Sequence, residues 1–315
     1  MKKFWKLGIV LGSLILMIGL VIGCAQKKEE PKESPKAATE EKDKMTIGLA
    51  VSTLNNPFFV DMRDGAKAAA DKMNAELVVV DAQDDASKQV SQVENLIQQK
   101  VDIILLNPTD SDGLVTAVKD ANEAKIPVIT LDRNVNGGTV TSHIASDNVA
   151  GGRMAAEYII KQLDRKGKVV ELEGIAGTSA ARDRGQGFHE VMDKEKNIKV
   201  VAKQPADFDR SKGLRVMENI LQSQPEINAV FAHNDEMALG ALQAVAAAKK
   251  DIMVVGFDGN DDAVNAVNDG KMAATVAQQP KLIGQLGVET AQRVVKGEKV
   301  DTNIPAKLKL ITKKE

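Results

Sequence analysis

The sequence predicts an α/β protein with two doubly wound parallel-sheet lobes. From residue 45 onward, short runs rich in Val, Ile and Leu alternate with amphipathic segments of helix length. This alternation is typical of parallel sheets that are covered by helices on both faces. The 271 residues from 45 to 315 also reach the length at which one hydrophobic core usually gives way to two.

The first 24 residues have the pattern of a targeting segment. Lys2, Lys3 and Lys6 precede an uncharged run from Leu7 to Ile22, which is followed by a small residue and Cys24. The run is too short to span a membrane comfortably, since a spanning helix needs about 20 residues. The segment resembles the bacterial lipoprotein signal, which implies that Cys24 becomes the lipidated first residue, on the extracytoplasmic face of the cell membrane. An uncleaved anchor is the alternative.

Residues 25–44 predict a disordered tether. The segment holds six Lys, six acidic residues and two Pro, and it has no large apolar side chain. Such a composition cannot bury enough surface to fold. We expect it to space the folded part away from the membrane.

Composition and missing motifs exclude several classes of function. Cys24 is the only cysteine, and the formal net charge is −2 without any basic run, which argues against thiol catalysis, disulfides and nucleic-acid binding. We find no G-x-G-x-x-G after the first strand, no phosphate-binding loop, no H-E-x-x-H and no calcium loop. The sequence therefore predicts neither an enzyme nor a cofactor or metal site.

The segment from Ile47 to Phe59 opens the folded part. An apolar run is followed by Ser52, Asn55 and Asn56 and then by Pro57, which fits the first turn of a helix. The pattern predicts a strand, a polar loop and a helix. Such a loop lies at the carboxyl end of its strand, where ligands bind in open α/β sheets.

Eight further strands and a series of helix starts follow along the chain. The strands are expected at Leu77–Asp81, Asp102–Asn107, Pro127–Asp132, Lys168–Leu172, Ile198–Ala202, Ala229–Ala232, Ile252–Asp258 and Ala273–Ala277. The residues that could open the helices are Asp85 or Ser87, Ser111, Asn148, Ser179, Asp209, Asn234 and Pro280. We expect the chain to change lobe at Ser142–Asn148, after the fourth strand and before a helix that begins around residues 150–152. The pattern alone allows the helix from Pro280 to lie in either lobe.

Polar and aromatic side chains cluster at the predicted strand ends. They are Ser52, Asn56, Phe58, Phe59, Asp132, Arg133, Arg182, Arg184, Asp207, Phe208, Asp209, Arg210, His233, Asn234, Asp235, Asp258, Gln278 and Gln279. Asn, Asp, Gln and Arg present planar sets of donors and acceptors that match the neighbouring hydroxyls of a sugar, and Phe rings can stack on its C–H face. Each residue alone has an ordinary structural explanation, as a helix cap, a surface ion pair or part of the core. Their joint occurrence at strand ends favours a small-molecule site.

Several long motifs in order resemble the ribose-binding proteins of bacterial ABC importers. They are VSTLNNPFF, NPTDSD, IPVITLDR, SHIASDN, GIAGTSAARDRG, QPADFDR, NDEMALGAL, MVVGFDG and AVNDGKMAATVAQ, and they extend from Met45 to about Leu310. The resemblance implies the type I periplasmic-binding-protein fold, in which the chain crosses three times between two lobes that close about a hinge. It implies lobes formed by residues 45–146 plus 279–307 and by residues 147–278 plus 308–315. The visible departures are His189, His233 and a Lys-rich stretch at 193–199.

The resemblance also implies a ligand site and its partners. By matching motif, the sugar contacts are Ser52, Asn56, Phe58, Phe59, Asp132, Arg133, Arg184, Phe208, Asn234, Asp258 and Gln278. The expected ligand is D-ribose, and the expected partners are an ABC importer permease and its ATPase subunit. The resemblance leaves a chemoreceptor open as a further partner, and we expect a monomer. Allose, xylose or a furanosyl signalling molecule remain alternative ligands.

Two related classes fit less well. A sugar-responsive repressor shares the fold but needs a DNA-binding headpiece, where this chain has a signal-like segment and a tether. Galactose-type relatives stack the sugar on Trp, and the single Trp here is Trp5 in the signal. The expected pocket is therefore lined by Phe.

Overall fold

The computed structural model describes residues 44–313, and residues 44–315 form one compact unit. The predicted lipid attachment at Cys24 and the tether lie outside the described residues. Within the described range, no helix is both long and apolar enough to cross a bilayer.

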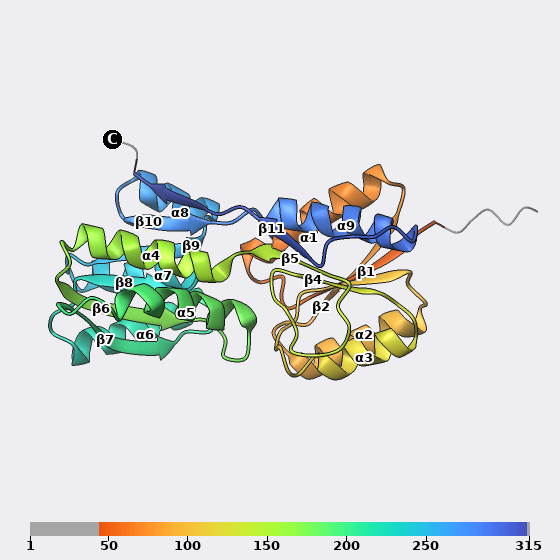
Figure 1. The fold of residues 1–315 in the computed structure, drawn as a ribbon. Coiled ribbons are helices and arrows are strands. Elements are labelled where there is room, and N and C mark those ends of the chain that lie inside the picture. Colours follow the sequence, from red (N-terminus) through yellow and green to blue (C-terminus); the bar gives the residue numbers. More distant parts are fainter. Residues whose placement is uncertain (1–43, 314–315) are drawn as a thin grey trace, which may run out of the picture. The chain divides into compact units, whose positions relative to one another are not determined.

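The first lobe is built on a parallel six-stranded sheet (Figure 1). In spatial order its strands are β11 (Asn303–Ala306), β5 (Ser142–Ser146), β4 (Val128–Leu131), β3 (Ile103–Leu106), β1 (Thr46–Val51) and β2 (Glu76–Asp81). Helices α1 (Pro57–Lys72) and α9 (Pro280–Val295) cover one face, and α2 (Ala86–Gln98) and α3 (Val115–Glu123) cover the other. Burial of both faces explains why β1, β3 and β4 are nearly continuous apolar runs.

The second lobe repeats this plan. In spatial order its strands are β12 (Lys309–Thr312), β10 (Ala274–Ala277), β9 (Met253–Asp258), β8 (Ala229–Ala232), β6 (Gly167–Glu173) and β7 (Ile198–Pro205). Only β12 runs antiparallel to its neighbour within this described sheet. Helices α4 (Asn148–Gln162) and α5 (Ser179–Met192) pack on one face, and α6 (Arg210–Ser223), α7 (Asp235–Ala247) and α8 (Asp261–Asn268) pack on the other.

The chain crosses between the two sheets three times, after β5, after β10 and after β11. The predicted fold class, two doubly wound lobes joined by three crossings, is confirmed. Helix α9 packs closely on α1, since a Cβ added at Gly284 would lie 1.9 Å from the carbonyl oxygen of Met62. This packing supports our proposal that the lobes divide as 45–146 plus 279–307 and 147–278 plus 308–315.

Each predicted strand overlaps an observed one, but three details of the prediction were wrong. The chain does leave the first sheet within Ser142–Asn148, as expected, but the prediction missed β5, which Ser142–Ser146 forms between β4 and β11. The following helix begins at Asn148, with Asp147 as its cap, and α5 is capped by Thr178, so Asn148 and Ser179 each lie one residue inside their helices.

Ser111 was the third error, because α3 begins only at Val115. The Ser111 hydroxyl instead donates to the carbonyl oxygen of Asn134 at 2.8 Å. Ser111 thus ties the segment after β3 to the segment after β4, and it caps no helix. The caps expected at Asp85, Asp209 and Asn234 are confirmed, each by a side chain that accepts a backbone N–H of the first turn.

Candidate functional site

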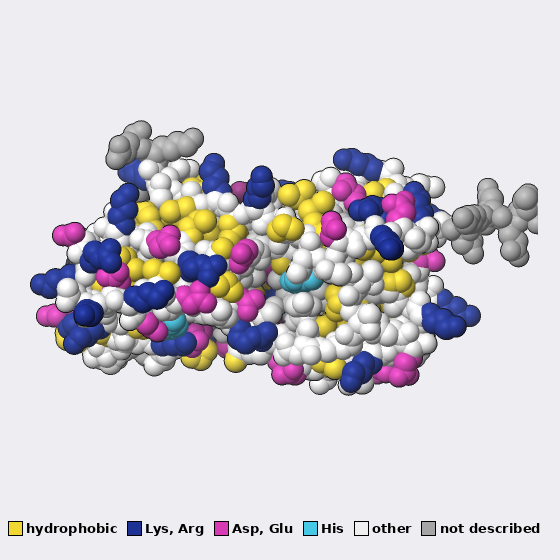
Figure 2. Space-filling model, in the orientation of Figure 1, with side chains coloured by type: hydrophobic (Ala, Val, Ile, Leu, Met, Phe, Trp, Pro, Cys, Tyr) yellow, Lys and Arg dark blue, Asp and Glu magenta, His cyan; other side chains and the backbone are white. Residues whose placement is uncertain are grey.

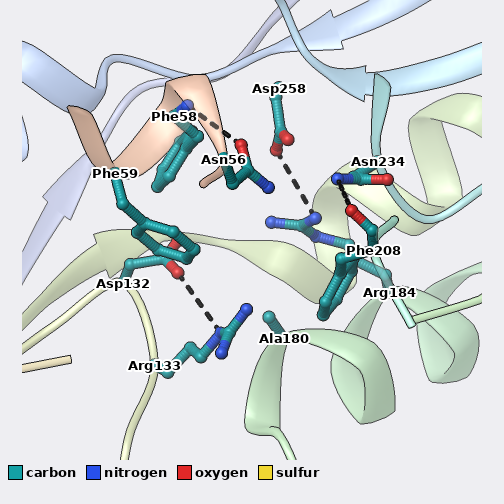
Figure 3. Close-up of a pocket in the computed structure, with 10 residues that line it drawn as sticks. All are labelled: Asn56, Phe58, Phe59, Asp132, Arg133, Ala180, Arg184, Phe208, Asn234 and Asp258. Carbon is teal, nitrogen blue, oxygen red and sulfur yellow. Dashed lines mark hydrogen bonds and ion pairs between the residues drawn. The ribbon is translucent and has the colours of Figure 1, made fainter. Parts of the chain in front are cut away.

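The carboxyl ends of both sheets bring the predicted residues to one cavity. The strand order in each lobe places the first strand between the second and the third, and ligands in such sheets bind beyond the carboxyl ends, where the order reverses. The residues that line the cavity are Asn56, Phe58, Phe59, Asp132, Arg133, Ala180, Arg184, Phe208, Asn234 and Asp258 (Figure 3). Both lobes contribute to it.

Helix caps fix two of the amide side chains. Asn56 precedes α1, and its side-chain oxygen accepts the N–H of Phe58 at 3.0 Å. Asn234 caps α7 in the same way, by accepting the N–H of Met237 at 2.9 Å, and its NH₂ group donates to the carbonyl oxygen of Phe208 at 3.2 Å. The capping hydrogen bonds therefore fix the amide group of each Asn at the edge of the cavity.

Three cavity residues have backbone conformations that L-residues rarely adopt. The φ angles of Asp132, Phe208 and Asp258 are 62°, 59° and 122°. Such conformations cost about 1–3 kcal/mol each and persist where surrounding contacts impose them. Their concentration around one cavity is typical of a functional site.

Two Arg side chains occupy the centre of the site. The guanidinium of Arg133 lies 5.0 Å from the ring centre of Phe59 in its own lobe and 5.2 Å from that of Phe208 in the other. The guanidinium of Arg184 lies 3.9 Å from the ring centre of Phe257. These cation–π contacts hold the planar groups in place and leave most of their N–H donors available.

Arg184 is also oriented by hydrogen bonds. Its Nε donates to the side-chain oxygen of Asn148 at 2.8 Å, and its Nη1 donates to the carbonyl oxygen of His233 at 2.6 Å. Asn148 opens α4 directly after the first crossing between the lobes. The buried imidazole of His233 binds the carboxylate of Glu171 at 2.9 Å, so His233 supports Arg184 from behind through its backbone.

Each Arg faces a carboxylate at a distance longer than a strong hydrogen bond. Arg133 Nε lies 3.8 Å from Asp132 Oδ2, and Arg184 Nη1 lies 3.5 Å from Asp258 Oδ1. Burial raises the pKa of the Asp132 carboxyl, although Arg184 and Arg133 oppose the shift. Burial likewise raises the pKa of Asp258 to about 7, against the opposing effects of Arg184 and Gln278.

Several buried polar atoms at the site have no hydrogen-bond partner among residues 44–313. They are Oδ1 of Asp132, Nε of Arg133 and Oε1 of Gln278. Buried polar atoms of folded proteins are nearly always satisfied. Hydroxyl groups of a ligand could satisfy these three atoms.

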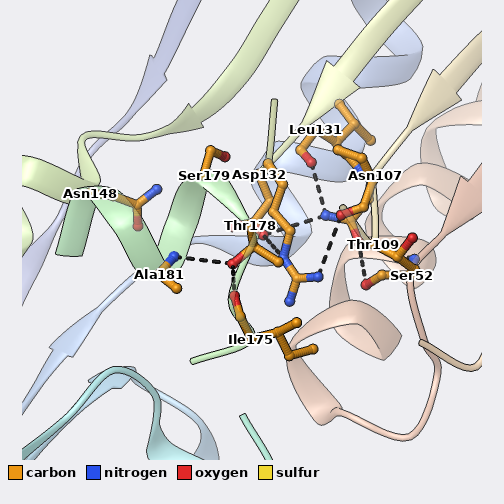
Figure 4. A network of polar contacts seen from close by, with 12 residues as sticks. Ser52, Asn107, Thr109, Leu131, Asp132, Asn148, Ile175, Thr178, Ser179 and Ala181 are labelled. Carbon is orange, nitrogen blue, oxygen red and sulfur yellow. Dashed lines mark hydrogen bonds and ion pairs between the residues drawn. The ribbon is translucent and has the colours of Figure 1, made fainter. Parts of the chain in front are cut away.

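A second layer of polar contacts holds the first-lobe loops. Asn107 Oδ1 accepts the hydroxyl of Ser52 at 2.7 Å, and Asn107 Nδ2 donates to the carbonyl oxygen of Leu131 at 3.1 Å (Figure 4). Gln89 donates to the carbonyl oxygen of Asn107 at 2.9 Å. The ends of β1, β3 and β4 are thereby linked to one another.

The structure brings all the predicted contact residues except two to the cavity wall. Ser52 lies behind the wall on Asn107, and Gln278 lies beside it, donating to Asp258 at 2.9 Å. Sequence reasoning missed Ala180, a small apolar residue in the first turn of α5 that carries no chemical signal. It also missed Asn107, which the same strand-end rule could have found, since Asn107 directly follows β3.

The profile of the periplasmic binding protein domain matches residues 47–299. The chain belongs to the periplasmic binding protein family. This is a family of solute-binding proteins, so the family relation agrees with the prediction that the chain is not an enzyme.

Relatives and solved structures extend the comparison. The ribose import binding protein of Bacillus subtilis (strain 168) is 53% identical over 302 residues, which cover 96% of this chain and 98% of the relative. The protein of the same name from Escherichia coli (strain K12) is 58% identical over 271 residues, which cover 86% and 91%. A periplasmic solute-binding protein from Actinobacillus succinogenes 130z, solved with D-allose, is 33% identical with a TM-score of 0.81 and covers 86% of this chain and 98% of that one.

Proposed function

We propose that this protein captures D-ribose between its two lobes and delivers it to an ABC importer. The observation that carries the proposal is the identity of 53–58% with the ribose import binding proteins of Bacillus subtilis and Escherichia coli. The alignments cover nearly the whole of the described chain, so they include every loop that lines the cavity.

The chemistry of the residues that line the cavity supports a sugar ligand. The carboxylates of Asp132 and Asp258 would accept from sugar hydroxyls, and the N–H groups of Arg133 and Arg184 would donate to them. Phe58, Phe59 and Phe208 would cover the C–H faces of the ring.

The eleven contact residues named from the sequence are accordingly proposed as the ribose site. Ser52 would act through Asn107, to which it is bound. Gln278 would bind the sugar through its unpartnered Oε1, and the other nine residues would face the sugar. Within residues 44–313, no group of three or more His, Cys, Asp or Glu side chains could hold a metal ion. The proposed recognition uses hydrogen bonds and aromatic contacts.

The proposed partners are the importer's permease and its ATPase subunit, with a chemoreceptor as a further partner. We propose that the protein is a monomer and that it binds no nucleic acid. On the face drawn in Figure 2, acidic and basic side chains are interspersed, and the formal net charge of the chain is −2. Nucleic-acid binding instead requires a concentrated basic surface.

We further propose that a lipid on Cys24 holds the protein at the extracytoplasmic face of the cell membrane. Support comes from the charged flank, the apolar run and the small residue before Cys24. Replacing Cys24 with Ala should release the protein from membrane fractions with unchanged sugar affinity, because stable anchoring depends on the acyl chains. Persistent membrane association of the variant would show that the apolar run itself remains as the anchor.

A calorimetric and thermal-shift screen of residues 44–315 would test the ligand. D-Ribose should bind more tightly than D-allose, D-xylose and L-arabinose, and it should raise the melting temperature most. Replacing the buried Arg184 with Met should abolish measurable binding, whereas replacing the exposed Arg182 with Met should leave it unchanged. If another sugar bound more tightly than ribose, that sugar would be the assigned ligand.

A further inference from the structure

Asp235 is a fully buried carboxylate just outside the cavity wall. It is the first residue of α7 and directly follows the cavity residue Asn234. Its Oδ2 accepts the N–H groups of Gly259 at 2.7 Å and of Asn260 at 2.8 Å, and its Oδ1 accepts the hydroxyl of Thr275 at 2.7 Å. One carboxylate thus joins α7, the turn after β9 and the strand β10.

The two amides bound by Asp235 belong to the turn that presents Asp258. The φ angle of Asp258 is 122° and that of Gly259 is 78°, so the backbone turns sharply directly after the cavity carboxylate. Hydrogen bonds from successive N–H groups to one carboxylate can impose such a turn. The chain also leaves room for this carboxylate, since a Cβ at Gly256 would lie 2.2 Å from Asp235 Oδ1.

We propose that Asp235 is a positioning residue for ligand binding. It holds the turn from Asp258 to Asn260 so that the carboxylate of Asp258 faces the cavity and Arg184, and its charge acts on that carboxylate. The proposal rests on the proposed function, because the ligand that Asp258 would bind is the sugar.

The charges around the two carboxylates define the electrostatic effect. Asp258 faces Arg184 of α5, Asp132 and Arg133 after β4, and the amide of Gln278 after β10. Burial, and then the charge of Asp258, raises the pKa of Asp235 well above its usual range, while Thr275 and the two amides oppose the shift. The two buried carboxylates therefore disfavour each other's ionisation.

Replacing Asp235 with Asn tests the proposal in the compact unit, residues 44–315. An amide group cannot accept both N–H groups and the Thr275 hydroxyl in the same way, so ribose affinity at pH 8 should fall by about tenfold or more. Removing a second ionisable carboxyl next to Asp258 should also favour the ionised form of Asp258, so the loss of affinity on acidification should begin at a lower pH than in the wild type. The exposed Asp261 in the adjacent first turn of α8, replaced with Asn, is the matched control.

Other outcomes of this experiment would overturn the proposal. Unchanged affinity would do so, and so would a loss by the same factor at every pH with a matching fall in melting temperature, which would assign Asp235 to the core alone. If the Asn variant does not fold, Thr275→Val removes one bond to the carboxylate and keeps both amide bonds. It should weaken binding by roughly threefold, and unchanged affinity would again contradict the proposal.

Hydrogen exchange separates this proposal from the proposed function. The amide protons of Gly259 and Asn260 should exchange markedly faster in Asp235→Asn than in the wild type, in the absence of any sugar. If the wild type bound no sugar, the proposed function would fail while this exchange experiment would still test the hold on the turn. Equal exchange in both proteins would overturn the positioning role.

Discussion

Phe208 shows how one residue can serve both the core and the ligand site. Its ring packs in the second-lobe core, and the guanidinium groups of Arg133 and Arg184 lie 5.2 and 5.7 Å from its centre. A Cβ at Gly174 would lie 2.0 Å from this ring, so the glycine leaves the space that the ring occupies. The sequence predicted an aromatic contact here but could not predict this dual packing.

Replacing Phe208 with Ala should weaken ribose binding by about 1–3 kcal/mol, because the sugar loses its aromatic cover and water reaches its hydrogen bonds. Calorimetry measures the loss. The matched control is Phe188→Leu, since Phe188 is stacked on Phe231 in the core at 4.8 Å and lies away from the cavity wall. Phe188→Leu should lower the melting temperature and leave the affinity unchanged. If Phe208→Ala also lowered only the melting temperature, Phe208 would belong to the core alone.

Phe58 and Phe59 combine the two roles in the first lobe. Both are buried within the core that α1 forms with its sheet, and both line the cavity. The structural interpretation of this Phe pair is therefore confirmed, and its contact with the sugar stays a prediction. Phe58→Ala would leave a cavity in the core of the first lobe, as Phe208→Ala would in the second, so affinity and melting temperature must be measured together for each variant.

At the scale of elements, the sequence predicted the strands with continuous apolar runs and missed the others. Strand β5 has the sequence SHIAS, and the polar residues at both of its ends are more typical of a connection than of a strand. Strands β11 and β12 each have four residues and lie at sheet edges, and β11 contains Pro305. Such strands depend on pairing with distant neighbours, which local sequence patterns do not reveal.

Much of the candidate site was predictable from the positions of the strands. Its residues directly follow strands, and the carboxyl ends of parallel strands meet at one edge of the sheet. The alternation of strands and helices was therefore enough to predict that Asn56 and Asp132 lie at one edge of the first sheet. That Asp258 of the second sheet faces them was implied only by the resemblance to the family. The supporting contacts of Asn107 and Asp235 depend on exact side-chain positions, which only the structure provides.

The edge region around β5 should make stability depend on pH through His143. Burial lowers the pKa of His143 to about 4, although a hydrogen bond with the backbone of Thr130 opposes the shift. Below the ordinary histidine pKa of 6.5, His143 is protonated in the unfolded chain but stays neutral in the folded protein until the pH approaches 4. The free energy of unfolding should fall between about pH 6.5 and pH 4, by up to about 1.4 kcal/mol per pH unit.

Urea unfolding at several pH values would measure this slope, and replacing His143 with Gln should flatten it.

His189 should affect the pH dependence of stability in the opposite direction. Burial would lower its pKa, but Asp193 and Glu171 more than compensate and raise it. His189 therefore adds stability below its ordinary pKa and loses that contribution as the pH rises, so His189→Gln should cost most stability at acid pH. An unchanged slope in the His143 variant would contradict the assignment.

The packing of α9 on α1 depends on glycine. A Cβ at Gly284 would lie 1.9 Å from the carbonyl oxygen of Met62, and one at Gly65 would lie 2.0 Å from that of Lys281. Replacing Gly284 with Ala should therefore force the helices apart and lower the free energy of unfolding by about 1–3 kcal/mol or more. Chemical denaturation measures the change, and the exposed Gln285 of the same helix, replaced with Ala, should change stability far less.

At the scale of the whole unit, the structure shows the lobes in contact across the cleft. The N–H of Ser111 donates to the carbonyl oxygen of Gly177 at 3.0 Å, and the N–H of Asn134 donates to the hydroxyl of Ser179 at 2.9 Å. Arg133 reaches Phe208 of the other lobe. These contacts describe a closed arrangement in which Asp132 and Arg133 are buried.

Closure without a ligand should be unfavourable for an electrostatic reason. Asp132 Oδ1 and Arg133 Nε have no hydrogen-bond partner among residues 44–313, and each such buried group costs about 1–3 kcal/mol. A sugar that supplies the partners favours the closed state by its differential affinity, because the open state offers contacts from one lobe alone. We therefore expect the free protein to be mainly open in solution and the ribose-bound protein to be closed.

Gly177 allows closure to be tested without changing a sugar contact. Its φ angle is 90°, and a Cβ added to it would lie 2.0 Å from Oδ2 of Asp110 in the opposite lobe. Gly177→Val should therefore obstruct the closed state and weaken ribose binding by at least about tenfold, which corresponds to roughly 1.4 kcal/mol.

Small-angle scattering should show that ribose reduces the radius of gyration of the wild type but not of the Gly177→Val variant. Removing the obstacle with Asp110→Ala in the Gly177→Val background should restore part of the affinity, whereas no restoration would point to backbone strain at Gly177. An unchanged radius in the saturated wild type would rule out closure as the mechanism of capture.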